Sequence, residues 1–258
     1  MDFAQEIETL IRARYPILYI LTGEETRVQS LLAVIAQKRQ KKIFEWSITT
    51  GLVPYGTSIQ SQKHRASPTK DPLLALDQVI DLVEPAVFVF KDFHPFLARP
   101  NHAIVRKLKE IALHLKNSQK TILITSPVQE IPTELEKEIT LLVHPLPDRD
   151  ELSGLLDRIT DDMRQFPNVK IELDAPGRER LLQAALGLTL GEAENVFARI
   201  LIQNGRLDGS HVHEVRGKAA DHPQKRSAGI LPERGIVCAR RRTRGAQGLA
   251  AKAGARVQ

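Results

Sequence analysis

Apolar residues along the first 145 positions gather into short runs that predict β-strands. The runs are rich in β-branched and aromatic residues, and most lack the polar alternation of a half-exposed strand, as is typical of parallel strands covered on both faces. Segments with helical spacing of apolar residues, among them 31–36, 73–83 and 104–115, fall between the runs. Strands that alternate with helices predict right-handed crossovers and a doubly wound sheet. The five predicted strands are 16–22 (PILYILT), 43–49 (IFEWSIT), 86–90 (AVFVF), 121–125 (TILIT) and 139–143 (ITLLV).

The pattern changes after Pro145, where only helical spacing continues. Residues 150–159 and 176–186 predict two helices, and Thr189 followed by Glu192 forms a capping-box pattern that predicts the start of a third. The predicted fold class is therefore α/β, with a P-loop-like, three-layer, parallel five-stranded sheet followed by a small helical lid and a disordered basic tail. The predicted division of the chain is an α/β domain of residues 1–145, a helical lid-like module of residues 146–208, and a linker and tail of residues 209–258.

The net charge of +6 comes from the tail. Residues 216–258 hold 11 Lys and Arg against 2 acidic residues, whereas the residues before them hold 26 against 29. The same tail has nine Ala and no Phe, Tyr or Trp, so it can bury little apolar surface to offset the entropy of ordering. We therefore expect a disordered tail behind a mildly acidic folded part.

The overall composition favours a globular protein and argues against a membrane-spanning, disulfide-bonded or zinc-binding one. Hydrophobic residues make up 42% of the chain and charged residues 26%, as is typical of soluble globular domains. No apolar run approaches the roughly 18 residues that a membrane span needs, and the acidic N-terminus does not resemble a targeting segment, so we expect a cytoplasmic protein. A single cysteine, Cys238, excludes an internal disulfide, and no Cys/His cluster has the spacing of a zinc site.

A parallel sheet followed by a helical module is the layout of an AAA-type ATPase, so the loop after the first strand is where phosphate binding would be expected. Such a loop needs glycines and a terminal Lys-Ser/Thr to hold phosphates and magnesium. Here the loop is Thr22-Gly23-Glu24-Glu25-Thr26-Arg27, with one glycine, no lysine and two carboxylates. The N-terminus of the helix that follows would favour a bound anion, but the carboxylates of Glu24 and Glu25 would repel it. The same two carboxylates are also well explained as first-turn residues that complement the dipole of that helix.

The ends of two further strands offer polar residues in the same region. Asp92 follows the third strand, where a carboxylate would coordinate magnesium, but the next residue is Phe93 rather than a glutamate that could polarise water. His94 could serve as a base, although packing at a strand end is the favoured interpretation. Thr125 ends the fourth strand, where a polar residue would sense phosphate. The candidate residues of a degenerate nucleotide site are Thr22, Gly23, Asp92 and Thr125, and we predict no catalytic residue and no metal ligand.

Four runs of the sequence resemble a specific family. They are YPILYILTGEE (15–25), VFVFKDFHPFL (87–97), KTILITSPVQEIPTELEKEITLLVHPLPDRDEL (120–152) and LLQAALGLTLGEAENVFARI (181–200). The runs resemble the N-terminal half of the AAA ATPase family of cyanobacteria and plastids encoded by a conserved chloroplast reading frame. The resemblance extends over roughly residues 1–215, and its most specific part is the run 120–152.

The resemblance implies a division of labour within the complete family protein. In that family a second AAA domain carries the GxxxxGK[ST] loop, the magnesium motif and the ATPase activity, and no such loop occurs in this chain. ATP and magnesium are therefore expected for the complete protein, whereas this chain is expected to need no cofactor and to be inactive alone. The implied role is a non-catalytic module that contacts protein partners or neighbouring subunits of a ring-like homo-oligomer. A weak nucleotide-binding domain that uses the degenerate loop stays open as an alternative.

The tail departs from the resemblance. The family continues in a form like SEEKQQIIRKSGLLEFY, whereas this chain continues VRGKAADHPQKRSAGIL from Val215. Back-translation of Val215–Leu231 in the +1 frame permits the family form at every position, so we hypothesise a single frame slip just before Arg216 that truncates the protein before the AAA core. The competing interpretation is a nucleic-acid arm at 240–244 (RRRTR), since clustered arginines bind phosphates non-specifically.

Overall fold

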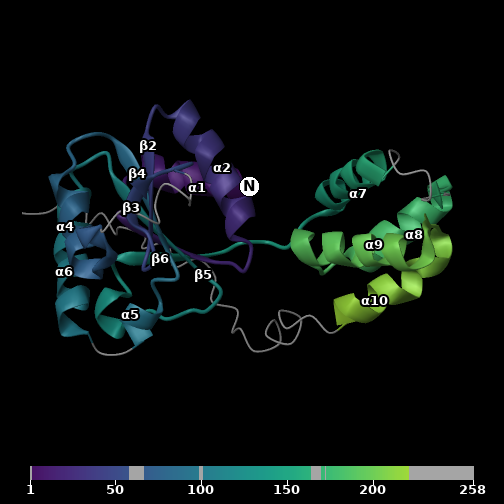
Figure 1. The fold of residues 1–258 in the computed structure, drawn as a ribbon. Helices are drawn as coiled ribbons and strands as arrows, with labels where there is room; N and C mark the ends of the chain where they lie inside the picture. The colour runs from purple at the N-terminus through teal and green to yellow at the C-terminus, as the bar shows by residue number, and fades with distance from the viewer. Residues whose placement is uncertain (1, 58–66, 99–100, 164–169, 172, 221–258) are drawn as a thin grey trace, which may run out of the picture.

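The computed structural model describes residues 2–57, 67–98, 101–163, 170–171 and 173–220. An α/β domain is joined to a helical module by a short connection (Figure 1). The α/β domain contains one six-stranded sheet in the order β3-β2-β4-β5-β1-β6. The strands are β1 (Ile17–Leu21), β2 (Lys42–Ser47), β3 (Gly51–Pro54), β4 (Ala86–Lys91), β5 (Thr121–Ser126) and β6 (Ile139–Val143).

The five strands predicted from the apolar runs form the parallel part of this sheet, which confirms the α/β fold class. The sixth strand, β3, is antiparallel to β2 and was not predicted. It has only four residues and ends in Pro54, which gives it too little pattern to distinguish it from a turn. Gly51 opens β3 at a φ of +74°, a conformation that glycine adopts without strain.

Helices cover both faces of the sheet, as a three-layer fold requires (Figure 1). They are α1 (Phe3–Arg12), α2 (Glu25–Lys38), α4 (Pro72–Asp81), α5 (Pro95–Ala98) and α6 (His102–Leu115). Leu18 and Ile20 of β1 pack with α1 and α2, while Ile17 and Tyr19 belong to the core on the face of α4 and α6. Successive strand residues point to opposite faces, so an unbroken apolar strand is what two covered faces demand.

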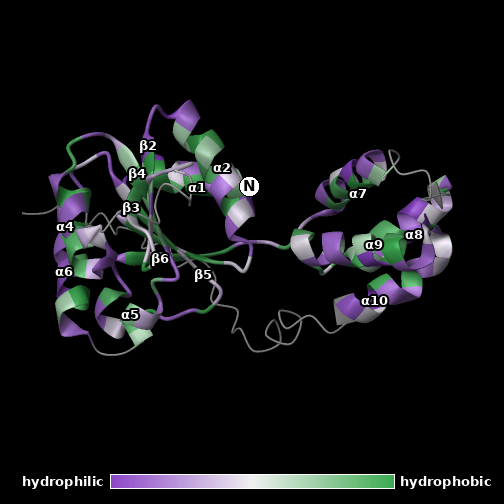
Figure 2. Ribbon diagram, in the orientation of Figure 1, coloured by the Kyte–Doolittle hydropathy of each residue, from purple (hydrophilic) through white to green (hydrophobic). Residues whose placement is uncertain are grey.

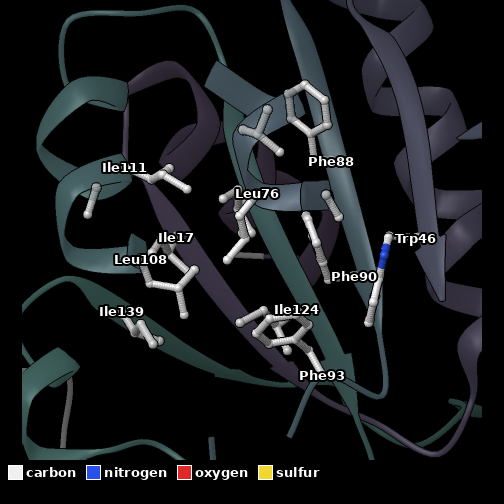
Figure 3. Packing of buried hydrophobic residues seen from close by; sticks show 14 of the residues in the cluster. Ile17, Trp46, Leu76, Phe88, Phe90, Phe93, Leu108, Ile111, Ile124 and Ile139 are labelled. Carbon is white, nitrogen blue, oxygen red and sulfur yellow. The ribbon is translucent and has the colours of Figure 1, made fainter. Parts of the chain in front are cut away.

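The core under α4 and α6 contains most of the aromatic side chains. Figure 3 shows the rings of Phe90 and Phe93 near Trp46 and the ring of Phe88 farther along the same core, together with aliphatic side chains of the helices. Trp46 has no exposed surface, and its Nε1 donates a hydrogen bond to the carbonyl of Thr69 at 2.6 Å. The indole thus satisfies its donor while its ring fills the core.

The helical module has a separate core. Its elements are α7 (Arg149–Met163), α8 (Ala175–Ala185), α9 (Leu190–Asn204) and α10 (Val212–Ala220), with the short strands β7 (Lys170–Ile171) and β8 (Arg206–Leu207). The predicted capping box is present: Thr189 Oγ1 accepts from the amide of Glu192, and the Glu192 carboxylate accepts from the amide of Thr189. Apolar residues of these helices form one buried cluster, and Figure 2 shows them as green stretches along the helices of the module.

Helical structure continues beyond residue 208, where a linker was expected to begin. Helix α10 packs on α8 and α9, and Val215 is completely buried in the core of the module. The segment is polar and short, with Val212 and Val215 as its apolar contacts, so its sequence alone shows no clear helical period. Residues 221–258 lie outside the described residues, and the disorder of the tail, the frame slip and the arginine arm stay predictions.

No helix among the described residues is long and apolar enough to cross a membrane.

A buried lysine ties α4 to the sheet. Lys120, directly before β5, is 5% exposed, and its Nζ donates to the carbonyls of Val79, Ile80 and Leu82 at 2.7, 3.0 and 2.7 Å. These carbonyls lie at the C-terminal end of α4, where backbone acceptors lack helical partners and the helix dipole favours a cation. Burial lowers the pKa of Lys120 below its ordinary value.

Replacing this lysine should destabilise the α/β domain. Lys120→Met keeps the aliphatic length but leaves the three carbonyls without their donor, so we expect the free energy of unfolding to fall by about 1–3 kcal/mol. Urea denaturation followed by tryptophan fluorescence measures this loss through Trp46. Lys116→Met, at an exposed position of the same region, is the matched control and should change stability by less than about 0.5 kcal/mol. Equal effects of the two substitutions would contradict a capping role for Lys120.

Candidate functional site

The carboxyl ends of β1, β4 and β5 bring three of the four predicted residues to one edge of the sheet. The amide of Thr22 donates to the carbonyl of Ser126 at 2.8 Å, and the amide of Asp92 donates to the carbonyl of Thr125 at 2.9 Å. Strand β5 lies between β1 and β4, so Thr22 and Asp92 flank its end. Ligands of open α/β sheets bind outside this edge, which is where the sequence predicted a site.

The four residues differ in what they offer a ligand. Thr22 and Thr125 are buried, at 3% and 2% exposure, and Asp92 is exposed with a φ of +49°. Of the four, only Gly23 lines the cavity described below. The Oγ1 of Thr125 is buried and has no hydrogen-bond partner among the described residues. The strand ends therefore lie close together, but the side chains of Thr22, Asp92 and Thr125 do not line one common cavity.

A cavity of about 1450 Å³ lies beside the loop after β1, between the two domains. The starts of α1 and α2, the connection before α7, helix α7 and the start of α9 line it. Its lining carries six carboxylates against two arginines, so its charge is opposite to that of a phosphate site. The charged residues of the lining are Asp2, Glu24, Glu25, Asp148, Glu151, Glu194, Arg27 and Arg158.

Glu24 extends across this cavity. Its Oε1 accepts a hydrogen bond from the backbone amide of Leu190 at 2.7 Å, at the N-terminus of α9, and its Oε2 lies 3.1 Å from Nη1 of Arg27. Its side chain is only 10% exposed. Glu25 lies in the first turn of α2 as expected, whereas Glu24, the N-cap residue, makes no capping hydrogen bond to α2 and directs its carboxylate to the start of α9.

Arg27 connects the same loop to α7. Its Nε donates to Oε1 of Glu151 at 3.1 Å, and its Nη1 donates to the carbonyl of Pro145 at 2.6 Å. The arginine is 15% exposed and therefore partly screened from solvent, whereas Glu151 is 41% exposed. One guanidinium thus contacts the first helix of the helical module, the connection between the domains and Glu24.

A threonine and a histidine support the loop after β1. Thr22 Oγ1 accepts from the amide of Glu24 at 2.9 Å and lies 3.2 Å from Nδ1 of His144, whose ring contacts Phe3 with centroids 4.9 Å apart. Burial, together with the positive charge of Arg27, lowers the pKa of His144 to about 4. His144 is therefore neutral at physiological pH, and it supports the loop through packing and a hydrogen bond.

The residues present do not fit a magnesium–nucleotide complex. Glu24 already holds the N-terminus of α9, and Glu25, whose pKa is raised by burial, adds a second acidic group beside the place for phosphate. No group of three or more His, Cys, Asp or Glu among the described residues is arranged to hold a metal ion. His94 donates or accepts a hydrogen bond with Ser126 Oγ at 2.9 Å and is not part of the cavity lining.

Two family models match the chain. The N-terminal domain of SpoVK-like AAA ATPases matches residues 3–144, and the second domain of the same proteins matches residues 150–217. The chain belongs to the SpoVK-like AAA ATPase family. The two matched ranges correspond to the α/β domain and the helical module, and the second extends into α10.

Curated relatives of this family agree with the resemblance drawn from the four sequence runs, which is confirmed. The AAA domain-containing protein ycf46 of Trieres chinensis is 31% identical over 215 residues, which cover 82% of this chain and 40% of the relative. The ycf46 protein of Guillardia theta is 30% identical over 204 residues, which cover 78% of this chain and 38% of the relative. The chain thus spans about 40% of the length of the curated relatives that it matches.

Solved AAA domains share the fold. The FIGL-1 AAA domain in complex with ADP superposes with a TM-score of 0.51 at 14% identity, over 88% of this chain and 80% of that domain. PCH-2 of C. elegans superposes with a TM-score of 0.52 at 12% identity, over 86% of this chain and 68% of that protein. At these identities the likeness concerns the fold, a sheet domain followed by helices.

Acid should weaken the loop support at His144. Its pKa of about 4 in the folded protein lies below the ordinary value of 6.5, so the unfolded chain binds a proton first as the pH falls. The free energy of unfolding should therefore drop between about pH 6.5 and pH 4, by about 1–2 kcal/mol after allowance for solvent screening at the edge of a cavity. Urea denaturation at a series of pH values measures this slope.

His144→Gln should flatten that slope, because glutamine does not titrate. His102→Gln, at an exposed histidine of α6, is the control and should leave the slope unchanged. An unchanged slope in His144→Gln would mean that other groups cause the acid sensitivity.

Proposed function

We propose that this chain is a non-catalytic AAA-like module that acts through protein contacts, either with partner proteins or with neighbouring subunits of an oligomeric ring. Membership of the AAA ATPase family gives the context, because ATP and magnesium belong to the complete proteins of such a family. The proposal places nucleotide hydrolysis in a domain outside this chain. A cytoplasmic location is part of the same proposal.

One observation supports the proposal: the loop after β1, where a nucleotide phosphate would bind, has no lysine and carries a carboxylate, Glu24, that is engaged with other groups of the chain. Glu24 accepts from the first amide of α9 and pairs with Arg27, so both the helix end and the nearby cation already have a negative partner. A polyphosphate at this loop would approach the carboxylates of Glu24 and Glu25 without a lysine to offset the repulsion. The energetic balance therefore opposes ATP.

Titration with fluorescent ADP and ATP, with magnesium present, tests the non-catalytic part. We expect no saturable signal up to about 1 mM nucleotide, which corresponds to a binding free energy weaker than about −4 kcal/mol, and no ATP hydrolysis. The FIGL-1 AAA domain, whose solved structure contains ADP, is the positive control. Saturable binding below this concentration would overturn the proposal.

The second candidate is weak nucleotide binding through the degenerate loop. The observation in its favour is the Oγ1 of Thr125, a buried hydroxyl without a hydrogen-bond partner among the described residues, at the edge where a ligand would approach. If the titration detects binding, Thr125→Val should weaken it only if that hydroxyl contacts the nucleotide. Thr9→Val, on the exposed surface of α1, is the matched control.

A ring-contact role predicts that the chain associates with itself. Sedimentation velocity over a wide range of protein concentrations should then show a reversible increase in sedimentation coefficient. A chain that stays monomeric throughout would remove the ring contact and leave contact with other proteins as the proposed role. Nucleic-acid binding through the arginine arm at 240–244 stays a prediction, because those residues lie outside the part of the chain that the structure describes.

A further inference from the structure

The two domains are connected by a continuous series of hydrogen bonds and ion pairs. It runs from the amide of Leu190 in α9 to the Glu24 carboxylate, then to the Arg27 guanidinium, and from there to the Glu151 carboxylate of α7. Two residues of the α/β domain thus hold two different helices of the module. Arg27 also binds the carbonyl of Pro145 in the connection itself.

The position of the Glu24 carboxylate has a clear electrostatic reason. The first amides of α9 lack helical acceptors and carry the positive end of the helix dipole, so they favour a negative group. The capping box of Thr189 satisfies the amide of Glu192, and Glu24 satisfies the amide of Leu190. Because Glu24 is 10% exposed and Arg27 15%, solvent screens this pair less than an ordinary surface ion pair.

We propose that Glu24 and Arg27 form an internal latch that substitutes for a bound anion and holds the helical module against the α/β domain without nucleotide. This inference rests on the proposed function, since a cleft without nucleotide needs another source of domain orientation. The latch fixes the angle between the domains, and with it the surface that the chain presents to other proteins. Its strength depends on ionic strength and on the charge of these side chains, and not on ATP.

The distance between the domains can be measured with a pair of spin labels. Val34 on α2 and Ile202 on α9 are 66% and 81% exposed, and both can be changed to cysteine in a Cys238→Ser background. Pulsed electron resonance should give one narrow distance distribution for the chain with Glu24 and Arg27 intact. In Glu24→Ala the ratio of open to closed molecules should rise about 10-fold or more, since a charged hydrogen-bond network of about 1.5–3 kcal/mol is removed.

Matched variants distinguish a latch from a general change in the cleft. Arg27→Met keeps the aliphatic stem and should broaden the distribution as Glu24→Ala does. Glu24→Gln keeps an acceptor for the Leu190 amide but loses the ion pair, so its effect should be intermediate. Glu194→Ala removes an exposed carboxylate of the same cavity and should leave the distribution narrow.

Salt gives a second measurement that needs no substitution in the latch. At about 1 M NaCl, where the Debye length is about 3 Å, the contact of Arg27 with the more exposed Glu151 should weaken, so the distribution of the doubly labelled chain should broaden, and Arg27→Met should be insensitive to the same change. If Glu24→Ala and Arg27→Met keep the narrow distribution, or if Glu194→Ala broadens it equally, the latch is wrong. A distribution shifted by ATP would instead contradict the non-catalytic proposal, and the two failures are therefore distinguishable.

Discussion

The carboxylate of Glu24 is largely buried. A buried charge is stable only where hydrogen bonds and an opposite charge compensate its lost hydration. Here the compensation comes from two sides, the amide of Leu190 and the guanidinium of Arg27. The loop after β1 fits this requirement, since Thr22 Oγ1 holds the Glu24 amide while the Glu24 carboxylate reaches the start of α9. The same loop that binds phosphate in other P-loop-like folds is thus organised around a carboxylate.

The compensated carboxylate also connects two units that fold around separate cores. The α/β domain buries the side chains of its strands between two helical layers, and the helical module buries its own residues among α7 to α10. Apolar packing therefore secures each unit internally, whereas the contacts described at the cleft are largely ionic. Ionic contacts are directional and respond to salt and pH. The relative position of the domains therefore depends on electrostatic interactions, whereas the interior of each domain depends on the burial of apolar surface.

Sequence patterns predicted the parallel strands well because a strand covered on both faces is rich in apolar residues and lacks polar alternation, as the buried strands β1 and β5 do. The capping box of α9 was equally predictable, since Thr189 and Glu192 lie three residues apart. The contact between Arg27 and Glu151 joins residues 124 positions apart, and no local period reports such a pairing. The sequence showed that the negative charge of Glu24 would repel a phosphate at this loop. It could not show that Glu24 binds the amide of Leu190, because that contact depends on how the two domains pack together.

The antiparallel strand β3 has a consequence for how the sheet can grow. It occupies one edge of the sheet, and it is short and ends at Pro54, which has no amide hydrogen to offer an incoming strand. Natural proteins protect sheet edges in this way against pairing with other chains. The opposite edge strand, β6, contains no proline between Ile139 and Val143. Another chain that extends this sheet, in ordered assembly or in aggregation, would therefore meet less obstruction along β6 than along β3.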